Sequence, residues 1–284
     1  MATNLPTLPV KEVPSFTIKS TSGWLRLDLK ELWRYRELIY FFVYRDIKVR
    51  YKQTVVGGAW AIAQPFFQMV IFSVVFGALA KLDSHGIPYP IFTYTALLPW
   101  MYFANSLTNT TNVVVEQARV ITKVYFPRVL LPLSAVVGGL VDFAVAFTIL
   151  IGLMFYFHTG IRWELVFLPL FLLLALLTAL AVGLWLSALN AIYRDVRYVL
   201  PFMIQLWLFA SPVAYSTSYV PERYRFLFGL NPMAGVVQGF RWAVLGDGEP
   251  PGQMLLLSTA VVLVILVGGL FYFRRMERRF ADVV

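Results

Sequence analysis

Four cationic side chains lie at the edge of a long apolar stretch. Arg45, Lys48, Arg50 and Lys52 come directly before residues 54–80, which contain no Asp, Glu, Lys or Arg. Cations in this position attract anionic lipid headgroups and stay on the cytoplasmic side of a membrane. We therefore expect them to hold the entrance of a first membrane span at the inner leaflet.

One ionisable residue, Asp142, lies inside an apolar stretch, LPLSAVVGGLVDFAVAFTIL. A carboxylate at the centre of a membrane helix costs about 3 kcal/mol on insertion scales, so Asp142 is expected to face protein or water. Two interpretations remain open. Asp142 is either a functional group, or it fixes helix packing beside Gly138 and Gly139.

Groups suited to catalysis or metal binding are scarce. The chain has no cysteine, no G-x-x-x-x-G-K-[ST] phosphate loop and no paired acids placed for glycosyl transfer or hydrolysis. The two histidines, His85 and His158, fall in short loops, where we expect solvated side chains rather than metal ligands. The sequence thus predicts no catalytic residue, no metal site and no cofactor in this chain.

The composition indicates that apolar helices position these groups. Of the 284 residues, 59% are hydrophobic and 14% are charged, whereas soluble domains have about 25% charged residues. A soluble fold around one large core would need polar helix faces, and these stretches are apolar all round. A helix needs about 20 apolar residues to cross a bilayer, so we predict an all-α membrane protein with six transmembrane helices. The six stretches are residues 56–80, 90–112, 129–157, 165–189, 198–217 and 253–273.

The distribution of Lys and Arg predicts the orientation of these spans. Nineteen of the 24 lie before the first span, in the loops 113–128 and 190–197, or in the C-terminal tail, and five lie in the intervening loops. Because basic loops remain in the cytoplasm, both termini are expected there. This placement of the net charge of +9 favours a membrane surface over nucleic acid as the partner.

The chain divides into three predicted parts. Residues 1–24 are expected to form a loose N-terminal tail, and residues 54–284 form the transmembrane domain. Residues 25–53 are too charged to span, but apolar residues recur there at helical spacing, which predicts an amphipathic helix in the inner membrane interface. A cytosolic helix packed on a soluble partner is the alternative. The apolar face consists of Leu32, Tyr35, Ile39, Phe42 and Val43.

The segment between the fifth and sixth spans, residues 211–246, is apolar and aromatic but interrupted by proline and glycine. Its uninterrupted pieces of about 10–14 residues favour short re-entrant helices over spans. We expect two such helices on the outer side, hinged at Leu230, Asn231 and Pro232. The alternative is an ordinary outer loop that packs on the spans.

Aromatic side chains are frequent, with 24 Phe, 15 Tyr and 8 Trp. Each one taken singly is expected to contact lipid or the protein core. As a set, together with nearby amides, they offer flat uncharged surfaces on which sugars stack. The residues predicted to line such a path are Trp60, Gln64, Phe67, Tyr94, Trp100, Tyr102, Phe103, Trp207, Phe209 and Tyr215.

Two short charged loops, residues 116–128 and 190–199, are predicted to face the cytoplasm. Each is either a small helix that docks a partner or a solvated turn. Because the chain has no nucleotide-binding loop of its own, we favour docking of an external source of energy. The residues predicted to transmit this coupling are Glu116, Arg119, Lys123, Arg194, Asp195 and Arg197.

Five stretches can be compared, in order, with known families: LWRYRELIYFFVYRDIKVRYKQTVVGGAWAIAQP, LLPWMYF, ITKVYFPRVLLPLS, LNAIYRDVRYVLPF and LNPMAGVVQGFRWAVLG. Taken together, they resemble ABC-2-type export permeases for polysaccharides. The resemblance runs from about Trp24 onward. Val56 departs from it mildly, since the family often has Leu at this position.

The resemblance implies a homodimeric permease in the bacterial inner membrane with two copies of a separate ATPase, which would bind ATP and Mg. The substrate would be a polysaccharide of the O-antigen, capsule or teichoic-acid type on a polyprenyl-diphosphate lipid. The cations of residues 45–52 would meet the diphosphate, and the first, second and fifth spans would form the channel. The outer gate would include Arg223, Tyr224, Asn231, Pro232 and Arg241.

Three other functions agree with the sequence to different degrees. An exporter of the same fold for a small amphiphile or drug remains open. An ion-coupled transporter that uses Asp142 is disfavoured, because such transport normally needs several intramembrane polar groups. An enzyme acting on polyprenyl-linked glycans would need paired acids or a metal-diphosphate site, and the sequence offers neither.

Overall fold

The computed structural model describes residues 33–52, 57–221, 224, 227–248 and 250–283. Within these ranges the protein is helical and contains no strand. The predicted tail, Leu32 and Arg223 lie outside the described residues. The helices are α2 (Arg36–Lys52), α3 (Gly57–Phe72, continued by a π-helix, Ser73–Leu79), α4 (Tyr89–Glu116), α5 (Ala118–Ile121), α6 (Leu130–Tyr156), α7 (Leu168–Ile192), α8 (Val196–Ala210), α10 (Pro232–Leu245) and α11 (Gly252–Val283), with single 3-10 turns at Trp163–Phe167 and Thr217–Tyr219.

All six apolar stretches are helical, and four helical segments are long and apolar enough to cross a membrane. These four are Trp60–Leu79, Leu130–Tyr156, Trp163–Ile192 and Gly252–Phe280. The second and fifth stretches are not among the four, so six spans stay a prediction. The second lies in α4, which is long enough but less apolar, and the fifth lies in α8, which has only 15 residues. It ends at Ala210 because Ser211 adopts an extended conformation before Pro212.

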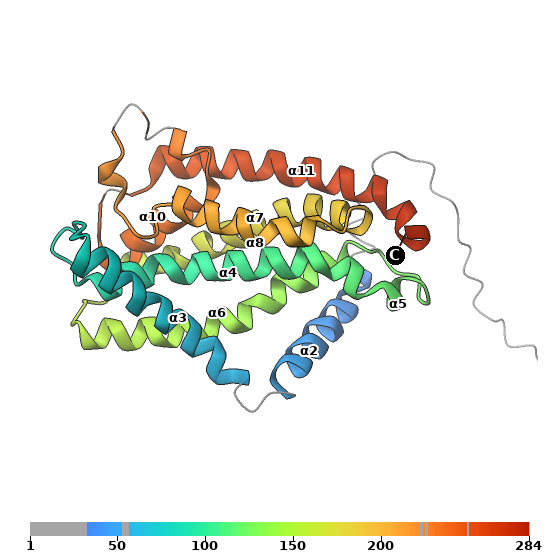
Figure 1. Cartoon of the computed structure of the whole chain (residues 1–284), viewed down its shortest axis with the longest axis horizontal. Helices are drawn as coiled ribbons and strands as arrows, with labels where there is room; N and C mark the ends of the chain where they lie inside the picture. Colours follow the sequence, from blue (N-terminus) through green and yellow to red (C-terminus); the bar gives the residue numbers. More distant parts are fainter. Residues whose placement is uncertain (1–32, 53–56, 222–223, 225–226, 249, 284) are drawn as a thin grey trace, which may run out of the picture.

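The central helix of the bundle is α4, which packs along α6 and α7 and also contacts α3, α8 and α10 (Figure 1). Small residues allow the closest of these approaches. A Cβ atom at Gly139 of α6 would lie 2.5 Å from Ser106 Oγ, and one at Gly183 of α7 would lie 2.5 Å from Thr110 Cγ2. Glycine at these positions lets the backbones approach each other, as is common between membrane helices.

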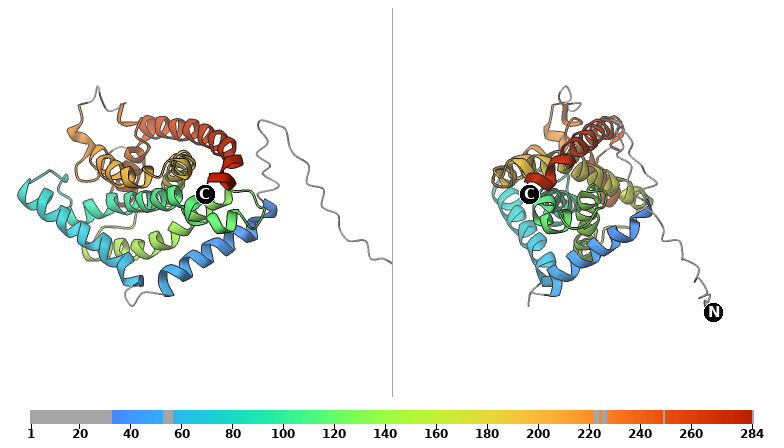
Figure 2. Two further views of the ribbon diagram at one scale, coloured as in Figure 1. Left: turned by 45° about the vertical axis from the view of Figure 1, so that its right-hand side comes forward. Right: turned by 90° about the vertical axis from the view of Figure 1, so that its right-hand side faces the viewer.

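The N-terminal helix α2 lies against α6, and Figure 2 shows α2 and α3 on the opposite side of the bundle from α11. The predicted apolar face is the one that packs. Phe42 is 2% exposed and meets the Phe126 ring at 5.6 Å, whereas Tyr40 and Phe41 are exposed. The apolar face of α2 therefore contacts its own chain, and its position in the membrane interface stays a prediction.

The short helix α10 is packed among α4, α7 and α11, and twelve of its fourteen residues are buried. It begins at Pro232, next to the predicted hinge, and ends at Gly246, whose φ of 69° is left-handed. Such a glycine terminates helices at little conformational cost. One short helix of the expected type is thus present, and its re-entry into the membrane remains a prediction.

Candidate functional site

The four cations of α2 lie in two different places. Three of them, Arg45, Lys48 and Lys52, line a groove of about 360 Å³ together with the aromatic side chains of Phe41 and Tyr44. Lys48 lies 5.6 Å from the centre of the Tyr44 ring. A groove with cations beside exposed aromatic rings is suited to a lipid with an anionic head.

The fourth cation, Arg50, turns away from this groove and forms an ion pair with Asp142 of α6. Asp142 is the thirteenth residue of α6, about 18 Å along the helix from its first residue at 1.5 Å per residue. The contact gives Asp142 the protein partner that a charge at this depth requires. No feature of the sequence pairs these two residues, but their side chains interact in the structure.

Polar side chains of α4 continue from this ion pair in both directions. Arg50 lines a cavity of about 310 Å³ with Asn109 and Glu116, while Asp142 lines a smaller one of about 40 Å³ with Asn105 and Gln64. Burial raises the pKa of Glu116, and the neighbouring Asp46 carboxylate raises it further. The polar end of α4 therefore faces the Arg50–Asp142 pair instead of lipid.

The predicted path residues separate into a buried group and an exposed group. Tyr94, Trp100, Tyr102 and Phe103 lie in the packed core around α4, and each is less than 5% exposed. Trp207 packs edge-on against Phe103 at 4.9 Å. The exposed group lies on α3 and α8 and consists of Trp60, Gln64, Phe67 and Phe209, with Tyr215 partly buried.

The two charged loops lie at the same end of the bundle. Asn190 of α7 donates hydrogen bonds to Thr111 O at 3.0 Å and Asn112 Oδ1 at 3.2 Å, which joins the ends of α7 and α4. All six predicted coupling residues are exposed there. They are Glu116, Arg119, Lys123, Arg194, Asp195 and Arg197.

The first of these loops also contacts two other elements. Arg45 Nη1 of α2 donates to Gln117 Oε1 at 2.9 Å. The Arg128 amide donates to Glu277 Oε1 of α11 at 3.1 Å, and the Arg128 guanidinium donates to the Glu277 carbonyl. A force applied to this loop would therefore reach α2 and α11 directly.

At the opposite end of the bundle, Arg241 of α10 is 0% exposed and holds the loop after α8. Its guanidinium donates to the carbonyl oxygens of Pro212, Val213 and Tyr215 at 2.7–2.8 Å and lies 3.8 Å from the centre of the Phe92 ring. Burial lowers the pKa of Arg241 to about 9, and the nearby Asp247 carboxylate opposes this shift. The side chain therefore stays charged at neutral pH.

Asn231 joins α8 to α10. Its Oδ1 accepts from the Met233 amide at 3.1 Å, which caps α10, and from Trp207 Nε1 at 2.8 Å. Its Nδ2 donates to Ala210 O and to Ser211 Oγ at 2.9 Å. Of the other predicted gate residues, Pro232 is buried at the start of α10 and Tyr224 is exposed.

One polar contact at this end was not predicted from the sequence. His85, expected to be solvated, lies 2.6 Å from Asp247 Oδ1, 162 residues further along the chain. No local pattern indicates this pairing, because the two residues belong to loops that only the folded bundle brings together. In the part of the chain that the structure describes, no group of three or more His, Cys, Asp or Glu side chains is placed to hold a metal ion.

Comparison with known proteins supports a transport role for this arrangement. The ABC-2 type transporter family matches residues 37–245 of the chain. The O-antigen export system permease protein RfbA of Myxococcus xanthus is 27% identical over 259 residues, covering 90% of this chain and 98% of that protein. An RfbA of Klebsiella pneumoniae is 27% identical over 251 residues (87% and 95%). The polysialic acid transport protein KpsM of Escherichia coli is 25% identical over 238 residues (82% and 91%).

Proposed function

The chain belongs to the ABC-2 type transporter family, and from this premise we propose that it is the membrane subunit of an ATP-driven polysaccharide exporter. The substrate would be a polysaccharide of the O-antigen, capsule or teichoic-acid type, linked to polyprenyl diphosphate. It would cross the bacterial cytoplasmic membrane from the inner to the outer leaflet. The observation that carries this proposal is the similarity over most of the chain to relatives named for O-antigen export and polysialic acid transport.

The groove on α2 supports a role in binding the lipid-linked end of the substrate. Arg45, Lys48 and Lys52 line this groove beside Phe41 and Tyr44, and Asp46 partly balances the Arg45 charge, since Arg45 Nη2 lies 2.7 Å from Asp46 Oδ1. A diphosphate would bind mainly Lys48 and Lys52, and its polyprenyl chain would lie against the aromatic rings. Arg50 does not line the groove, and its guanidinium is paired with Asp142.

The exposed aromatic residues support a path at the surface of the chain instead of inside it. Trp60 and Phe67 are each 60% exposed and Phe209 is 54% exposed. In a homodimer these side chains of α3 and α8 would face a second copy and line a shared channel, on which sugar rings stack. The core aromatics of α4 would then shape the channel wall from behind.

The loops 116–128 and 190–199 support docking of a separate ATPase subunit, which would bind ATP and Mg. Besides their charges, they expose large apolar side chains, with Tyr125 75% and Tyr198 69% exposed. Exposed aromatic residues beside charged ones are typical of protein interfaces. ATP-driven closure of the partner would push on these loops and so move α2 and α11. Both termini would then lie in the cytoplasm.

Reconstitution tests the proposal. The purified chain and its ATPase subunit are placed in proteoliposomes with lipid-linked O-antigen, and polysaccharide on the opposite face is detected with a fluorescent lectin. We expect transport that requires ATP and falls at least tenfold in Lys48→Gln/Lys52→Gln. The control Lys81→Gln removes one exposed cation at the other end of the bundle and should leave transport unchanged. Movement of a small cationic dye without movement of polysaccharide would favour a drug exporter and contradict the proposal.

A further inference from the structure

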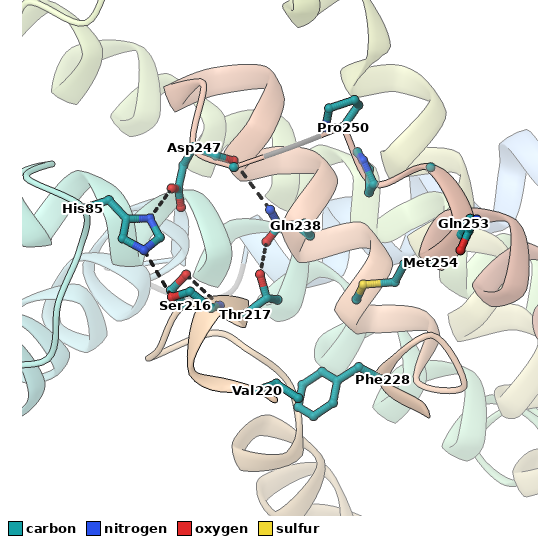
Figure 3. A pocket seen from close by; sticks show the side chains of 14 residues that line it. His85, Ser216, Thr217, Val220, Phe228, Gln238, Asp247, Pro250, Gln253 and Met254 are labelled. Carbon is teal, nitrogen blue, oxygen red and sulfur yellow. Dashed lines mark hydrogen bonds and ion pairs between the residues drawn. The ribbon is translucent and has the colours of Figure 1, made fainter. Parts of the chain in front are cut away.

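A further cavity lies at the end of the bundle opposite the charged loops, between the loop after α3, residues 216–220 and the start of α11 (Figure 3). It encloses about 710 Å³. Binding sites for small molecules span roughly 300–1,000 Å³, so the cavity has room for a ligand the size of one or two sugar rings.

A fixed series of polar groups forms one wall of this cavity. The Asp247 carboxylate is 4% exposed and lies 2.6 Å from His85 Nδ1, while His85 Nε2 lies 3.1 Å from Ser218 Oγ. With the imidazole proton on Nδ1, His85 donates to Asp247 and accepts from the Ser218 hydroxyl. Ser218 is exposed at the cavity, so the series ends in a hydroxyl that a ligand can reach.

The same order of groups occurs in serine hydrolases, but the backbone around Ser218 argues against acyl transfer. The amides of Ser218, Tyr219 and Val220 donate to Ser216 Oγ, Ser216 O and Thr217 O. An oxyanion needs free amide donors next to the nucleophile, and loss of one such donor slows acyl transfer by about 10²–10³. We therefore interpret the series as a binding surface.

Other lining side chains complete a surface with both polar and apolar parts. Gln238 is held in place, because its Oε1 accepts from Thr217 Oγ1 at 3.1 Å. Across the cavity from His85 and Asp247, Figure 3 shows Gln253 and Met254, with Phe228 below them. Hydroxyl and amide groups beside an aromatic ring and a thioether match the hydroxyls and C–H faces of a sugar.

The charge of the lining favours neutral sugars. Among the described residues that line the cavity there is no Lys or Arg, and Asp247 is the one carboxylate. The nearby Arg241 directs its guanidinium at the carbonyls of residues 212–215 instead. An acidic sugar would find no Lys or Arg among these residues to balance its charge.

We propose that this cavity is a binding subsite for one or two neutral sugar residues of the polymer, on the outer side of the membrane. The proposal rests on the proposed export function and adds to it a place where the emerging chain is held before release. Ser218 Oγ, whose proton is donated to His85, would accept a hydrogen bond from a sugar hydroxyl, and the Gln253 amide would both donate and accept. Phe228 would contact the C–H face of the ring.

Saturation-transfer NMR on the purified chain in lipid nanodiscs tests the subsite. The probes are the neutral trisaccharide mannotriose and the acidic disaccharide of sialic acid. We expect saturation transfer to mannotriose and none to the sialic acid dimer. Ser218→Ala and Gln253→Ala should each weaken mannotriose binding about tenfold, equivalent to about 1.4 kcal/mol. Both positions are exposed, so these changes should leave folding intact. The matched control Gln68→Ala removes an amide of α3 outside the cavity and should leave binding unchanged.

The outcomes separate this proposal from the export function. A chain that exports polysaccharide but transfers no saturation to mannotriose overturns the subsite alone. Equal binding of mannotriose by wild type, Ser218→Ala and Gln253→Ala also overturns it. Binding of both probes with equal strength overturns the preference for neutral sugars. Mannotriose binding that needs Ser218 and Gln253, in a chain that moves no polysaccharide with its ATPase, supports the subsite and refutes export.

Discussion

Arg50 and Asp142 are 92 residues apart in the chain, and their side chains form an ion pair that ties α2 to α6. Asp142 lies in the apolar helix α6, whereas Arg50 belongs to α2 and its side chain is 40% exposed. A charge on the apolar part of a membrane helix is tolerated only beside a partner of opposite charge, backbone carbonyls or water. The pair therefore couples the position of the N-terminal helix, which contacts the first charged loop, to a helix inside the bundle.

Removal of one partner should destabilise the protein more than removal of both. Arg50→Gln removes the positive charge beside the Asp142 carboxylate, and we expect a loss of about 2–3 kcal/mol. The double variant Arg50→Gln/Asp142→Asn has no uncompensated charge and should recover at least half of this. Thermal unfolding in detergent measures the effect. If the double variant is less stable than either single variant, an uncompensated charge does not explain the loss of stability in the single variants.

The same double variant also tests Asp142 as an ion carrier. If Asp142 only holds helix packing, ATP-driven polysaccharide transport should persist at half the wild-type rate or better. Complete loss of transport in a protein that is stable and correctly inserted would instead support a functional role for the ion pair, and the same loss in Asp142→Asn but not in Arg50→Gln would assign that role to the carboxylate.

The groove on α2 should bind anionic lipids through its three cations. A cation near a membrane surface contributes about 1 kcal/mol, so Lys48→Gln and Lys52→Gln should each weaken binding of phosphatidylglycerol about fivefold. Arg45→Gln should weaken it less, because Asp46 already balances part of the Arg45 charge. Lipid binding to the purified protein can be measured by native mass spectrometry. Lys81→Gln serves as the control, and an equal loss in this variant would point to net charge alone.

The exposed side chains on the charged loops should contact the ATPase. The chain contains no cysteine, so a single engineered cysteine gives an unambiguous cross-link. With a bifunctional maleimide reagent, Tyr125→Cys should cross-link to the ATPase, whereas Tyr156→Cys should not. Both tyrosines are about three-quarters exposed, at 75% and 76%, but Tyr156 lies at the opposite end of α6. Cross-linking through Tyr156 would place the ATPase at the wrong end of the bundle.

Asn231 should stabilise the connection between α8 and α10. Asn231→Ala removes the helix cap and the contacts with Trp207 and Ser211, and we expect a loss of about 2 kcal/mol. Asn231→Asp keeps the accepting oxygen for Met233 and Trp207 and should lose less than half as much. Unfolding monitored by tryptophan fluorescence measures both variants. Equal loss in the two would assign the effect to the Nδ2 donors instead of the cap.

Much of the fold can be predicted from the sequence, because span-length apolar stretches form helices wherever they lie. The apolar face of α2 was also predictable, since Tyr35, Ile39 and Phe42 follow helical spacing and the face they form packs on α6. In helices that are apolar on every face, the spacing of apolar residues does not show which face is buried. No periodicity indicates that Tyr94 is buried and Phe67 exposed, so the sequence could not separate core aromatics from those available to a partner.

The contacts between distant residues were not predictable for another reason. Asp142 was recognised as costly, but nothing near it in the chain identifies Arg50 as its partner. His85 and Asp247 come together only because their two loops meet at one end of the bundle. Such pairs depend on how helices are arranged in space, which local composition does not encode.

Two adjacent glycines of α6, Gly138 and Gly139, differ in how closely they approach α4, so alanine substitutions at the two positions can be compared directly. A Cβ atom at Gly139 would meet Ser106 Oγ at 2.5 Å and the Tyr102 ring at 3.2 Å, whereas one at Gly138 meets nothing within 4 Å. Gly139→Ala should therefore push α6 from α4 and destabilise the protein by about 1–3 kcal/mol. Gly138→Ala should be neutral or stabilise it by up to about 1 kcal/mol, because alanine is the better helix former. Thermal unfolding of the two variants side by side measures the difference, and equal melting temperatures would refute the close approach of α6 to α4 at Ser106.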